Sequence, residues 1–457
     1  MAINILGINI STDSRQEILK KISDFLNGKT PRYIVTPNPE FLLAAKHDEE
    51  FFYILNQADI AVPDGIGLVF AGWFMGKNIK RTAGIDLMLS LCALAAKRNK
   101  SVYLLGGEGQ VAQAVAEKLK SQFPNLKIAG AEEGLKPGAW KLRSGKWLKG
   151  KAENQKLLER INAAKPDIIF VAFGHPRQER WIYHNLPLLN PPLIKGREGW
   201  SGVKVAVGVG GSFDFISGRI KRAPNWMRAS GLEWLYRLWQ EPAKRSSRIW
   251  AAVMEFPLEF LKWRFIRPWL YRPNVVCLLY KKEGLPAEAN NNLTDEHNLR
   301  RAKAGDRINS VESNGAAASF HGVKVLLAER RHPAGHWQLP QGGTDGEDLT
   351  TAGTRELREE IGTRKFKPVA CFKNLYKYKF GATPSRGVKA SQILGHKGQK
   401  QGLFIAEFIG KDEDITINFW DHCAWRWVDL DKVADEVHKY RKEATKIFID
   451  KFKSILK

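Results

Sequence analysis

Strand-like and helix-like runs alternate along the first half of the chain. Short apolar runs such as 33–36, 101–107 and 167–174 are separated by longer runs with apolar residues at helical spacing, for example 41–58 and 85–98. Consecutive parallel strands need a crossover connection, which is usually a helix, so this alternation is typical of a parallel sheet covered on both faces. The sequence therefore predicts a Rossmann-like α/β domain.

Polar and glycine residues follow the predicted strands. In such sheets ligands bind beyond the carboxyl ends of the strands, and glycine lets the backbone approach a phosphate. The residues at these positions are Thr36, Asn38, Asp64, Gly106, Gly107, Gln178, Gly208, Gly210 and Gly211. Taken singly, each glycine pair is more typical of a tight turn, and Asp64 of an Asp-Gly turn. Taken together, they predict one ligand site.

The length and charge of the chain limit its class. A chain of 457 residues holds about two or three domains. Its net charge of +24 predicts an anionic partner, whether a phosphate-bearing substrate, a nucleic acid or an acidic lipid. Four cysteines without a CxxC pair indicate neither a zinc site nor a disulfide framework. Because the N-terminus lacks a signal-peptide pattern, we expect a cytoplasmic protein.

The segment 232–272 is basic and aromatic, with five tryptophans. Apolar residues recur at helical spacing, and lysines and arginines outnumber the glutamates. One interpretation is a helix lying in a membrane interface, with its cations towards anionic lipid. The other is a pair of helices packed on its own domain. Glu255, Glu259, Lys262 and Arg264 interrupt the most apolar part, so it should not span a bilayer.

The motifs of the first part, taken in order, closely resemble those of the WecG/TagA/CpsF glycosyltransferase family. These motifs are TPNPEFLLAA, VPDGIG, RTAGIDL, YLLGG, FGHPRQERW and GVGGSFDFISGRIKRAPNWMRASGLEWLYRLWQEP. The resemblance places Thr36 and Asn38 beside the sugar and makes Asp64 the candidate general base. Arg81 and Gln178 become further active-site residues, and the glycines of 208–211 contact the nucleotide.

The resemblance implies inverting transfer of N-acetylmannosamine, or a related sugar, from a UDP donor. The acceptor would be N-acetylglucosamine linked to a polyprenyl diphosphate on the inner face of the cell membrane. No DxD motif occurs before residue 412, so no metal cofactor is expected for this domain. Basic residues of the appendage would hold the diphosphate instead. Arg237 matches the family well, whereas Arg245 and Arg248 stand one residue late.

The second part, 273–457, contains a different acidic motif. Glu356, Glu359 and Glu360 fall at i, i+3 and i+4, on one helix face, which suits Mg²⁺ or Mn²⁺ bridging to phosphates. In isolation such a patch is more typical of a solvated acidic helix. In context it resembles the Nudix box, whose other positions are Gly342, Gly343, Glu347, Arg355 and Gly362. The resemblance implies an α+β Nudix fold and metal-assisted hydrolysis of a nucleoside diphosphate derivative.

Two departures from the Nudix pattern lie off the metal-binding turn. Four residues, rather than five, separate Gly342 from Glu347, and Thr363 replaces an apolar residue. WQLPQGG, GQKQ and WRWVDL look most like the RNA pyrophosphohydrolase and dinucleoside-polyphosphate hydrolase branch. The polar run 285–316 has few apolar residues and predicts a disordered insertion.

These observations predict three parts: a transferase domain (1–231), a membrane-contact appendage (232–272) and a Nudix domain (273–457). The leading hypothesis is a bifunctional enzyme attached peripherally to the inner face of the membrane. A non-catalytic nucleotide-binding Nudix module and an RNA-binding 5′-pyrophosphohydrolase are the alternatives. The sequence does not fix the oligomeric state, and a homo-oligomer stays open.

Overall fold

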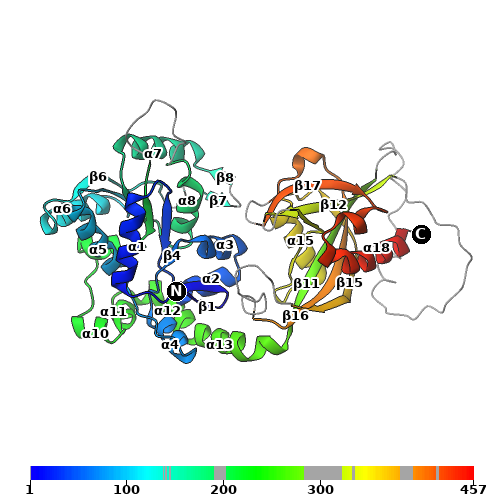
Figure 1. Cartoon of the computed structure of the whole chain (residues 1–457), viewed down its shortest axis with the longest axis horizontal. Coiled ribbons are helices and arrows are strands. Elements are labelled where there is room, and N and C mark those ends of the chain that lie inside the picture. The colour runs from blue at the N-terminus through cyan, green and yellow to red at the C-terminus, as the bar shows by residue number, and fades with distance from the viewer. Residues whose placement is uncertain are drawn as a thin grey trace, which may run out of the picture. The chain divides into compact units, whose positions relative to one another are not determined.

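The chain forms two compact units in a computed structural model (Figure 1). The structure describes residues 2–136, 138, 141–143, 146–189, 202–282, 322–331, 335–380, 395–417 and 421–456, without the side chains of 142–148, 229, 244, 245, 247 and 248. The first unit is Met1–Leu270 with Phe380–Lys397, and the second is Tyr271–Lys379 with Gly398–Lys457. The predicted insertion, 285–316, lies outside the described residues.

The first unit is built on a six-stranded sheet of order β4-β3-β10-β9-β5-β6. Every neighbouring pair in it is parallel, as the alternating sequence predicts. Its strands are β3 (Arg32–Val35), β4 (Ile60–Ala61), β5 (Ser101–Gly106), β6 (Lys127–Glu132), β9 (Ile168–Ala172) and β10 (Val205–Gly208). Two antiparallel hairpins accompany it, β1 (Ala2–Ile5) with β2 (Ile8–Ser11), and β7 (Lys141–Arg143) with β8 (Lys146–Lys149).

Helices cover both faces of this sheet because successive strand residues point to opposite sides. Ile34 enters one hydrophobic core, and its neighbours Tyr33 and Val35 enter the other. The Ile34 side is covered by α1 (Arg15–Asn27), α5 (Gly84–Lys97), α6 (Val111–Gln122) and α9 (Ser212–Ser217). The opposite side is covered by α2 (Pro39–Lys46), α3 (Glu49–Gln57), α4 (Ile66–Phe74), α7 (Lys151–Ala164), α8 (Arg177–Asn185) and α13 (Phe256–Leu261).

The helical run expected over 41–58 is two helices rather than one. α2 ends at Lys46, and α3 begins after Asp48, whose carboxylate accepts a hydrogen bond from the Phe51 N–H at 2.9 Å. An aspartate in this N-cap position satisfies a backbone donor that a continuous helix would have paired internally. The single-helix interpretation of this run was therefore wrong.

The segment after residue 231 is helical almost throughout. It follows α10 (Asn225–Ala229) and comprises α11 (Glu233–Gln240), α12 (Pro242–Trp250), η1 (Ala251–Glu255), α13, η2 (Lys262–Ile266) and η3 (Arg267–Trp269). Phe256, Phe260 and Trp263 are buried in the core of the first unit. Buried Glu259 also pairs with Lys46 at 3.1 Å and with Arg267 at 2.6 Å. One face of this segment therefore packs on its own domain.

The opposite face of the same segment is apolar and exposed. Its members are Trp250, Val253, Met254, Leu258, Leu261, Phe265, Ile266 and Trp269. Most of these belong to the apolar stripe expected at an interface. Among the described residues, no helix combines the length and the apolar character that crossing a membrane requires.

The second unit contains a mixed seven-stranded sheet. β11 and β16 are parallel, and the other pairs are antiparallel. The strands are β11 (Tyr271–Lys282), β12 (Val323–Arg330), β13 (His336–Gln338), β14 (Gln341–Gly343), β15 (Phe366–Lys379), β16 (Gly398–Phe408) and β17 (His422–Asp429). α15 (Leu349–Glu360) covers one core, and α17 (Val433–Glu436) and α18 (Lys442–Leu456) cover the other. Short η4 (Asp412–Asp414) and η5 (Lys439–Arg441) complete the unit, which confirms the expected α+β arrangement.

Candidate active sites

Asp64 lies just beyond β4 and just before α4, and its side chain reaches the N-terminus of α5. Its Oδ2 accepts a hydrogen bond from the Gly84 N–H at 3.0 Å, and its Oδ1 lies 3.8 Å from Nε of Arg81. A Cβ at Gly84 would lie 3.6 Å from Asp64 Oδ2 and 3.7 Å from the Thr36 hydroxyl. Burial raises the pKa of Asp64 above its usual value, although Arg81 and the Gly84 N–H oppose the shift. A carboxylate with a raised pKa suits proton abstraction.

Arg81 is held by a carboxylate from the segment after residue 231. Its Nη2 donates to Oε2 of Glu233 at 3.1 Å, and its Nη1 donates to the Arg228 carbonyl at 3.3 Å. Glu233, which is 7% exposed, also lies 3.5 Å from Nε of Arg222, whose Nη1 reaches Asp86 at 2.8 Å. Alternating charges thus run from Asp64 through Arg81 to the start of α11. Sequence analysis missed Glu233 because its partners lie far away in the chain.

Gln178 lies in the first turn of α8, the helix after β9, and its side chain contacts the glycine segment after β10. Its Oε1 accepts from the Gly210 N–H at 3.0 Å, and its Nε2 donates to Oε1 of Glu179 at 2.7 Å. Glu179 is fully buried, and burial raises its pKa to about 7 against the opposing bonds from Gln178 and its own N–H. Sequence analysis missed Glu179, although it follows Gln178 directly. Gln178 therefore positions the glycine backbone, and Glu179 fixes Gln178.

Close backbone packing explains the glycines at the ends of β5 and β10. Gly106 has φ +121°, and a Cβ there would lie 2.7 Å from the Ala172 carbonyl oxygen. A Cβ at Gly208 would lie 2.7 Å from Nε2 of Gln178. Gly107 has φ +77°, which also favours glycine. Glycine at these positions allows the neighbouring backbone and side chains to approach closely. Gly107 also lines the cavity described next.

A cavity of about 1310 Å³ opens at this edge of the sheet. Its lining includes these sequence-predicted residues: Thr36, Asn38, Asp64, Arg81, Gly107, Gln178, Gly210, Gly211 and Arg237. Gly106 and Gly208 are not among the residues that line the cavity. The side chains of Arg245 and Arg248 lie outside the described residues. The structure thus brings together residues from six separate sequence motifs.

Two of the lining residues have specific local roles. Asn38 caps α2, because its Oδ1 accepts a hydrogen bond from the Phe41 N–H at 3.0 Å. The guanidinium carbon of Arg237 lies 4.7 Å from the ring centroid of Phe215. A Cβ at Gly211 would lie 3.2 Å from Nη2 of Arg237. A cation held over an aromatic ring and beside a bare backbone is suited to a phosphate.

The acidic motif of the second unit is gathered around one arginine. Arg355 Nη1 lies 2.7 Å from Glu356 Oε1 and 3.4 Å from Glu359 Oε2, and its Nε donates to Glu347 at 2.9 Å. Glu360 accepts from the Gln341 N–H at 3.0 Å. Glu356 and Glu360 are buried, and Glu359 is partly exposed. Burial favours a lower pKa for Arg355, but the carboxylates of Glu356, Glu347 and Glu359 outweigh it and raise that pKa.

Three glycines of the same motif allow this close packing. A Cβ at Gly342 would lie 2.0 Å from the carboxylate of Glu356, and one at Gly343 would lie 2.3 Å from Nη2 of Arg272. Gly362 has φ +70°, and a Cβ there would lie 2.3 Å from the Thr416 carbonyl oxygen. The four-residue spacing from Gly342 to Glu347 is accommodated, since Glu347 still reaches Arg355.

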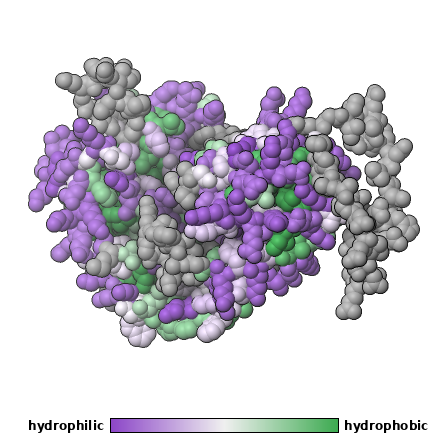
Figure 2. Space-filling view, turned by 45° about the vertical axis from the view of Figure 1, so that its right-hand side comes forward, coloured by the Kyte–Doolittle hydropathy of each residue, from purple (hydrophilic) through white to green (hydrophobic). Residues whose placement is uncertain are grey.

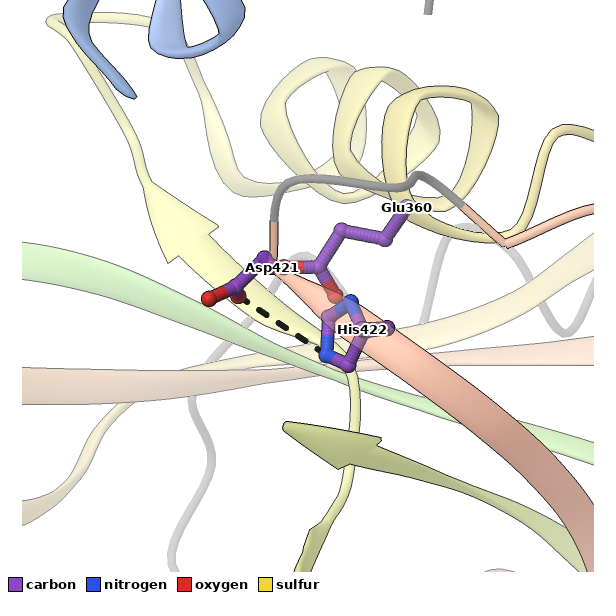
Figure 3. Close-up of side chains that lie close together, drawn as sticks. All are labelled: Glu360, Asp421 and His422. Carbon is purple, nitrogen blue, oxygen red and sulfur yellow. Dashed lines mark ion pairs between the residues drawn. The ribbon is translucent and has the colours of Figure 1, made fainter. Parts of the chain in front are cut away.

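Asp421 and His422, at the start of β17, extend the acidic cluster (Figure 3). Their side chains and that of Glu360 point towards one another, with one ligand atom of each within 4.8 Å of the others. Burial lowers the pKa of His422 although Asp421 opposes it, so the ring is neutral at neutral pH. Burial favours a higher pKa for Asp421, but the neighbouring guanidinium of Arg330 outweighs it and lowers that pKa. Sequence analysis missed both, and proximity to WRWVDL was the available signal.

The residues present fit a divalent cation. Buried carboxylates are costly unless cations neutralise them. Here Glu360 and Asp421 lie beside the neutral imidazole of His422, and Glu356 and Glu359, on the same helix as Glu360, meet at Arg355. Oxygen donors of this kind suit hard divalent ions. Glycine at 342 is required for the carboxylate of Glu356 to occupy its place. A metal site is therefore compatible with both the geometry and the donor set.

Comparison with known families assigns the two halves. The model of the "Glycosyl transferase WecG/TagA/CpsF family" matches residues 3–269, and that of the NUDIX domain matches 315–450. The chain therefore belongs to the WecG/TagA/CpsF family of glycosyl transferases and carries a NUDIX domain in its second unit.

Similar curated proteins match the first half. The N-acetylglucosaminyldiphosphoundecaprenol N-acetyl-beta-D-mannosaminyltransferase of Bacillus subtilis is 33% identical over 256 residues, covering 56% of this chain and 86% of that protein. The protein of the same name from Bacillus spizizenii is 35% identical over 51% of this chain and 79% of its own length. The chain is thus related to enzymes that transfer a sugar.

Two solved structures resemble part of the chain. A Caenorhabditis elegans Ap4A hydrolase shares 15% identity with a TM-score of 0.24, covering 40% of this chain and 98% of that one. An Escherichia coli dihydroneopterin triphosphate pyrophosphohydrolase also shares 15% identity, with a TM-score of 0.23 over 40% of this chain and 99% of that one. The NUDIX assignment itself rests on the family match to residues 315–450.

Glu179 should make the stability of the first unit depend on pH. Its folded pKa of about 7 exceeds the ordinary 4.5, so the protonated carboxyl favours the folded state. This stability is complete below the unfolded pKa and is lost as pH rises through the folded one. Relative to Glu179→Gln, we expect the thermal midpoint of wild-type protein to fall between about pH 5 and about pH 8. Parallel midpoint curves for the two proteins would contradict this assignment.

Proposed function

We propose that the first unit transfers N-acetylmannosamine, or a related sugar, from a UDP donor to N-acetylglucosamine on a polyprenyl diphosphate. The observation that carries this proposal is the cavity in which Asp64, Arg81 and Arg237 meet. The printed activity of the related mannosaminyltransferases supplies the substrate class. The cavity has room for two substrates, since about 1310 Å³ exceeds the usual pocket for one small ligand, roughly 300–1,000 Å³.

Asp64 is the proposed general base. Its Oδ2 is fixed by the Gly84 N–H, so its Oδ1 takes the proton of the acceptor hydroxyl. The acceptor oxygen then bonds to the anomeric carbon as the bond from that carbon to UDP breaks on the opposite face, which inverts the configuration. Arg81, 3.8 Å from Asp64, favours the ionised carboxylate before the proton arrives.

Negative charge on the departing UDP needs a cationic partner. Arg237 is the candidate, because its guanidinium reaches Gly211 at the end of β10 and lies over Phe215. Preorganised donors of this kind stabilise a leaving diphosphate without rearranging during the reaction. Gln178, buried and bonded to Gly210, keeps the same backbone in place.

We further propose that the second unit hydrolyses nucleoside diphosphate derivatives with Mg²⁺ or Mn²⁺. Glu356, Glu359 and Glu360 would hold the cation, with Asp421 and His422 at the edge of the same cluster. The bound cation would supply Lewis acidity and lower the pKa of a coordinated water. Arg355 orients Glu356 and Glu359 through its two contacts.

The exposed apolar face supports peripheral attachment to the inner face of the cell membrane. It includes Trp250, Leu258 and Trp269 from the segment after residue 231, and Trp73 from α4. Lys262 and Arg264 lie on the same segment and suit anionic headgroups. Large apolar surface on a protein whose relatives act on an undecaprenol-linked sugar favours a lipid surface.

The two activities should be separable by single substitutions. Asp64→Asn should lower kcat for sugar transfer by roughly 10²–10⁴-fold, because the proton acceptor is lost, and leave hydrolysis unchanged. Glu359→Gln should abolish hydrolysis and leave transfer unchanged. Transfer is measured with UDP-sugars and a lipid-linked acceptor. Hydrolysis is measured with Mg²⁺ on UDP-sugars, dinucleoside polyphosphates and 5′-triphosphate RNA.

Matched controls are Asp24→Asn on α1 and Glu413→Gln on η4, both at exposed positions. Each control should retain both activities. Transfer that survives Asp64→Asn at the wild-type rate removes Asp64 as the base. A wild-type protein that binds nucleotides but hydrolyses no member of the panel makes the second unit a binding module.

Removing the exposed apolar face should weaken membrane binding. We expect Trp73→Glu with Leu258→Glu to reduce co-sedimentation with vesicles that contain phosphatidylglycerol, because carboxylates replace apolar contact and repel the anionic lipid. Ile409→Glu, at an exposed position of the second unit, is the matched control. Equal sedimentation of all three proteins would exclude this face as the membrane contact.

A further inference from the structure

Apolar residues form part of the lining of the active-site cavity, and we call that part its apolar end. The polar end contains Asp64, Arg81 and Arg237. Two walls line the apolar end: Ile66, Gly67 and Phe70 from α4, and Ile249, Ala252, Val253 and Pro257 from the segment 249–257. The base and an apolar groove thus share one cavity. No part of the proposed sugar-nucleotide chemistry uses these carbon-lined walls.

The two walls are fixed by close packing. A Cβ at Gly67 would lie 2.8 Å from Cγ of Pro39 and 3.5 Å from the ring of Phe256. Phe74 of α4 packs edge to face against Phe260 and Phe265, at centroid distances of 6.0 and 5.7 Å. These contacts of Gly67 and Phe74 hold α4 against α13 and η2. The two walls of the groove are therefore fixed by packing within the first unit.

The apolar end opens towards exposed apolar surface. Phe70 and Val253 line the cavity and are themselves 63% and 43% exposed. Trp73 and Phe74 lie on α4, Leu258 lies on α13 directly after the segment 249–257, and all three are exposed as well. Hydrophobic colouring gathers along the lower edge of the molecule in Figure 2, at the height of α4 and α13 in Figure 1. An apolar path therefore leads from this surface into the cavity that holds Asp64.

We propose that this groove between α4 and the segment 249–257 binds the isoprenoid chain of the acceptor. The inference rests on the proposed transferase function and adds a lipid subsite to it. An acceptor sugar with its hydroxyl at Asp64 carries its diphosphate next and its hydrocarbon chain after that. A cavity with a carboxylate at one end and carbon-lined walls at the other follows the same order. The acceptor hydroxyl can then reach Asp64 while the isoprenoid chain stays in an apolar environment, and exposure of that hydrocarbon to water, which is unfavourable, is avoided.

Adjacent exposed residues provide a matched pair of variants. Val253 lines the groove, whereas Met254 does not, and the two are 43% and 46% exposed. Val253→Asp and Met254→Asp add the same charge to the same element, and both side chains are exposed enough for the fold to tolerate it. Only Val253→Asp places a carboxylate in the groove. Ala252→Trp, which fills the groove without charge, is a second variant, with Ala243→Trp at an exposed position of α12 as its control.

The experiment measures transfer in detergent with two acceptors. One carries the sugar diphosphate on a long polyprenyl chain, and the other carries it on a two-carbon alkyl group. We expect Val253→Asp and Ala252→Trp to raise KM for the long-chain acceptor roughly tenfold, because the chain loses its apolar site. KM for the short acceptor and for the UDP-sugar should stay unchanged. Met254→Asp and Ala243→Trp should leave all of these values at the wild-type level.

Three outcomes would overturn the inference. Wild-type protein that uses long and short acceptors equally well has no lipid subsite. Equal losses from Val253→Asp and Met254→Asp would assign the effect to the outer surface and a general lipid contact. Equal losses on both acceptors would assign it to the catalytic end. Failure of wild-type protein to transfer sugar to either acceptor would instead overturn the proposed function itself.

Discussion

The ion pair between Arg81 and Glu233 connects the catalytic edge of the first unit to the helical segment that follows it. Glu233 is buried at the start of α11, and Arg81 stands between it and Asp64. A buried carboxylate is costly unless cations pair with it. The charge of Glu233 therefore depends on its ion pairs with Arg81 and Arg222. The proposed base Asp64, its neighbouring cation Arg81 and the first turn of α11 are therefore positioned together.

Because the Arg81–Glu233 ion pair ties it to the catalytic residues, the segment 232–270 has three roles. Its first turn orients Arg81, and Arg237 on the same helix faces the glycine segment. Further along, Phe256, Phe260 and Trp263 pack into the core. The opposite face leaves apolar residues exposed, and part of it lines the groove that we assign to the isoprenoid chain. The segment is thus a structural part of the first unit, and it carries the apolar face that we propose for membrane contact.

Much of the fold and part of both sites could be predicted from the sequence. Strand runs, strand-end residues such as Asp64, and the acidic motif around Glu359 have signals within a few residues of themselves. Glu233 carries no such local signal, because Arg81 comes from a distant element. For Asp421 the only local signal was its proximity to WRWVDL, and its partner Glu360 is distant in the chain. Glu179 looks like an ordinary charged residue beside Gln178, and only its burial reveals its role. The break at Asp48 was readable as an N-cap, but the apolar periodicity of 41–58 concealed it.

A double-mutant cycle on Arg81 and Glu233 tests the central claim most directly. If Glu233 acts through Arg81, Glu233→Gln and Arg81→Gln should each lower kcat/KM for sugar transfer by roughly tenfold or more. The double variant should then be no worse than Arg81→Gln alone. Losses that multiply in the double variant would mean that the two side chains act independently, and the proposed link between α11 and the catalytic edge would be wrong.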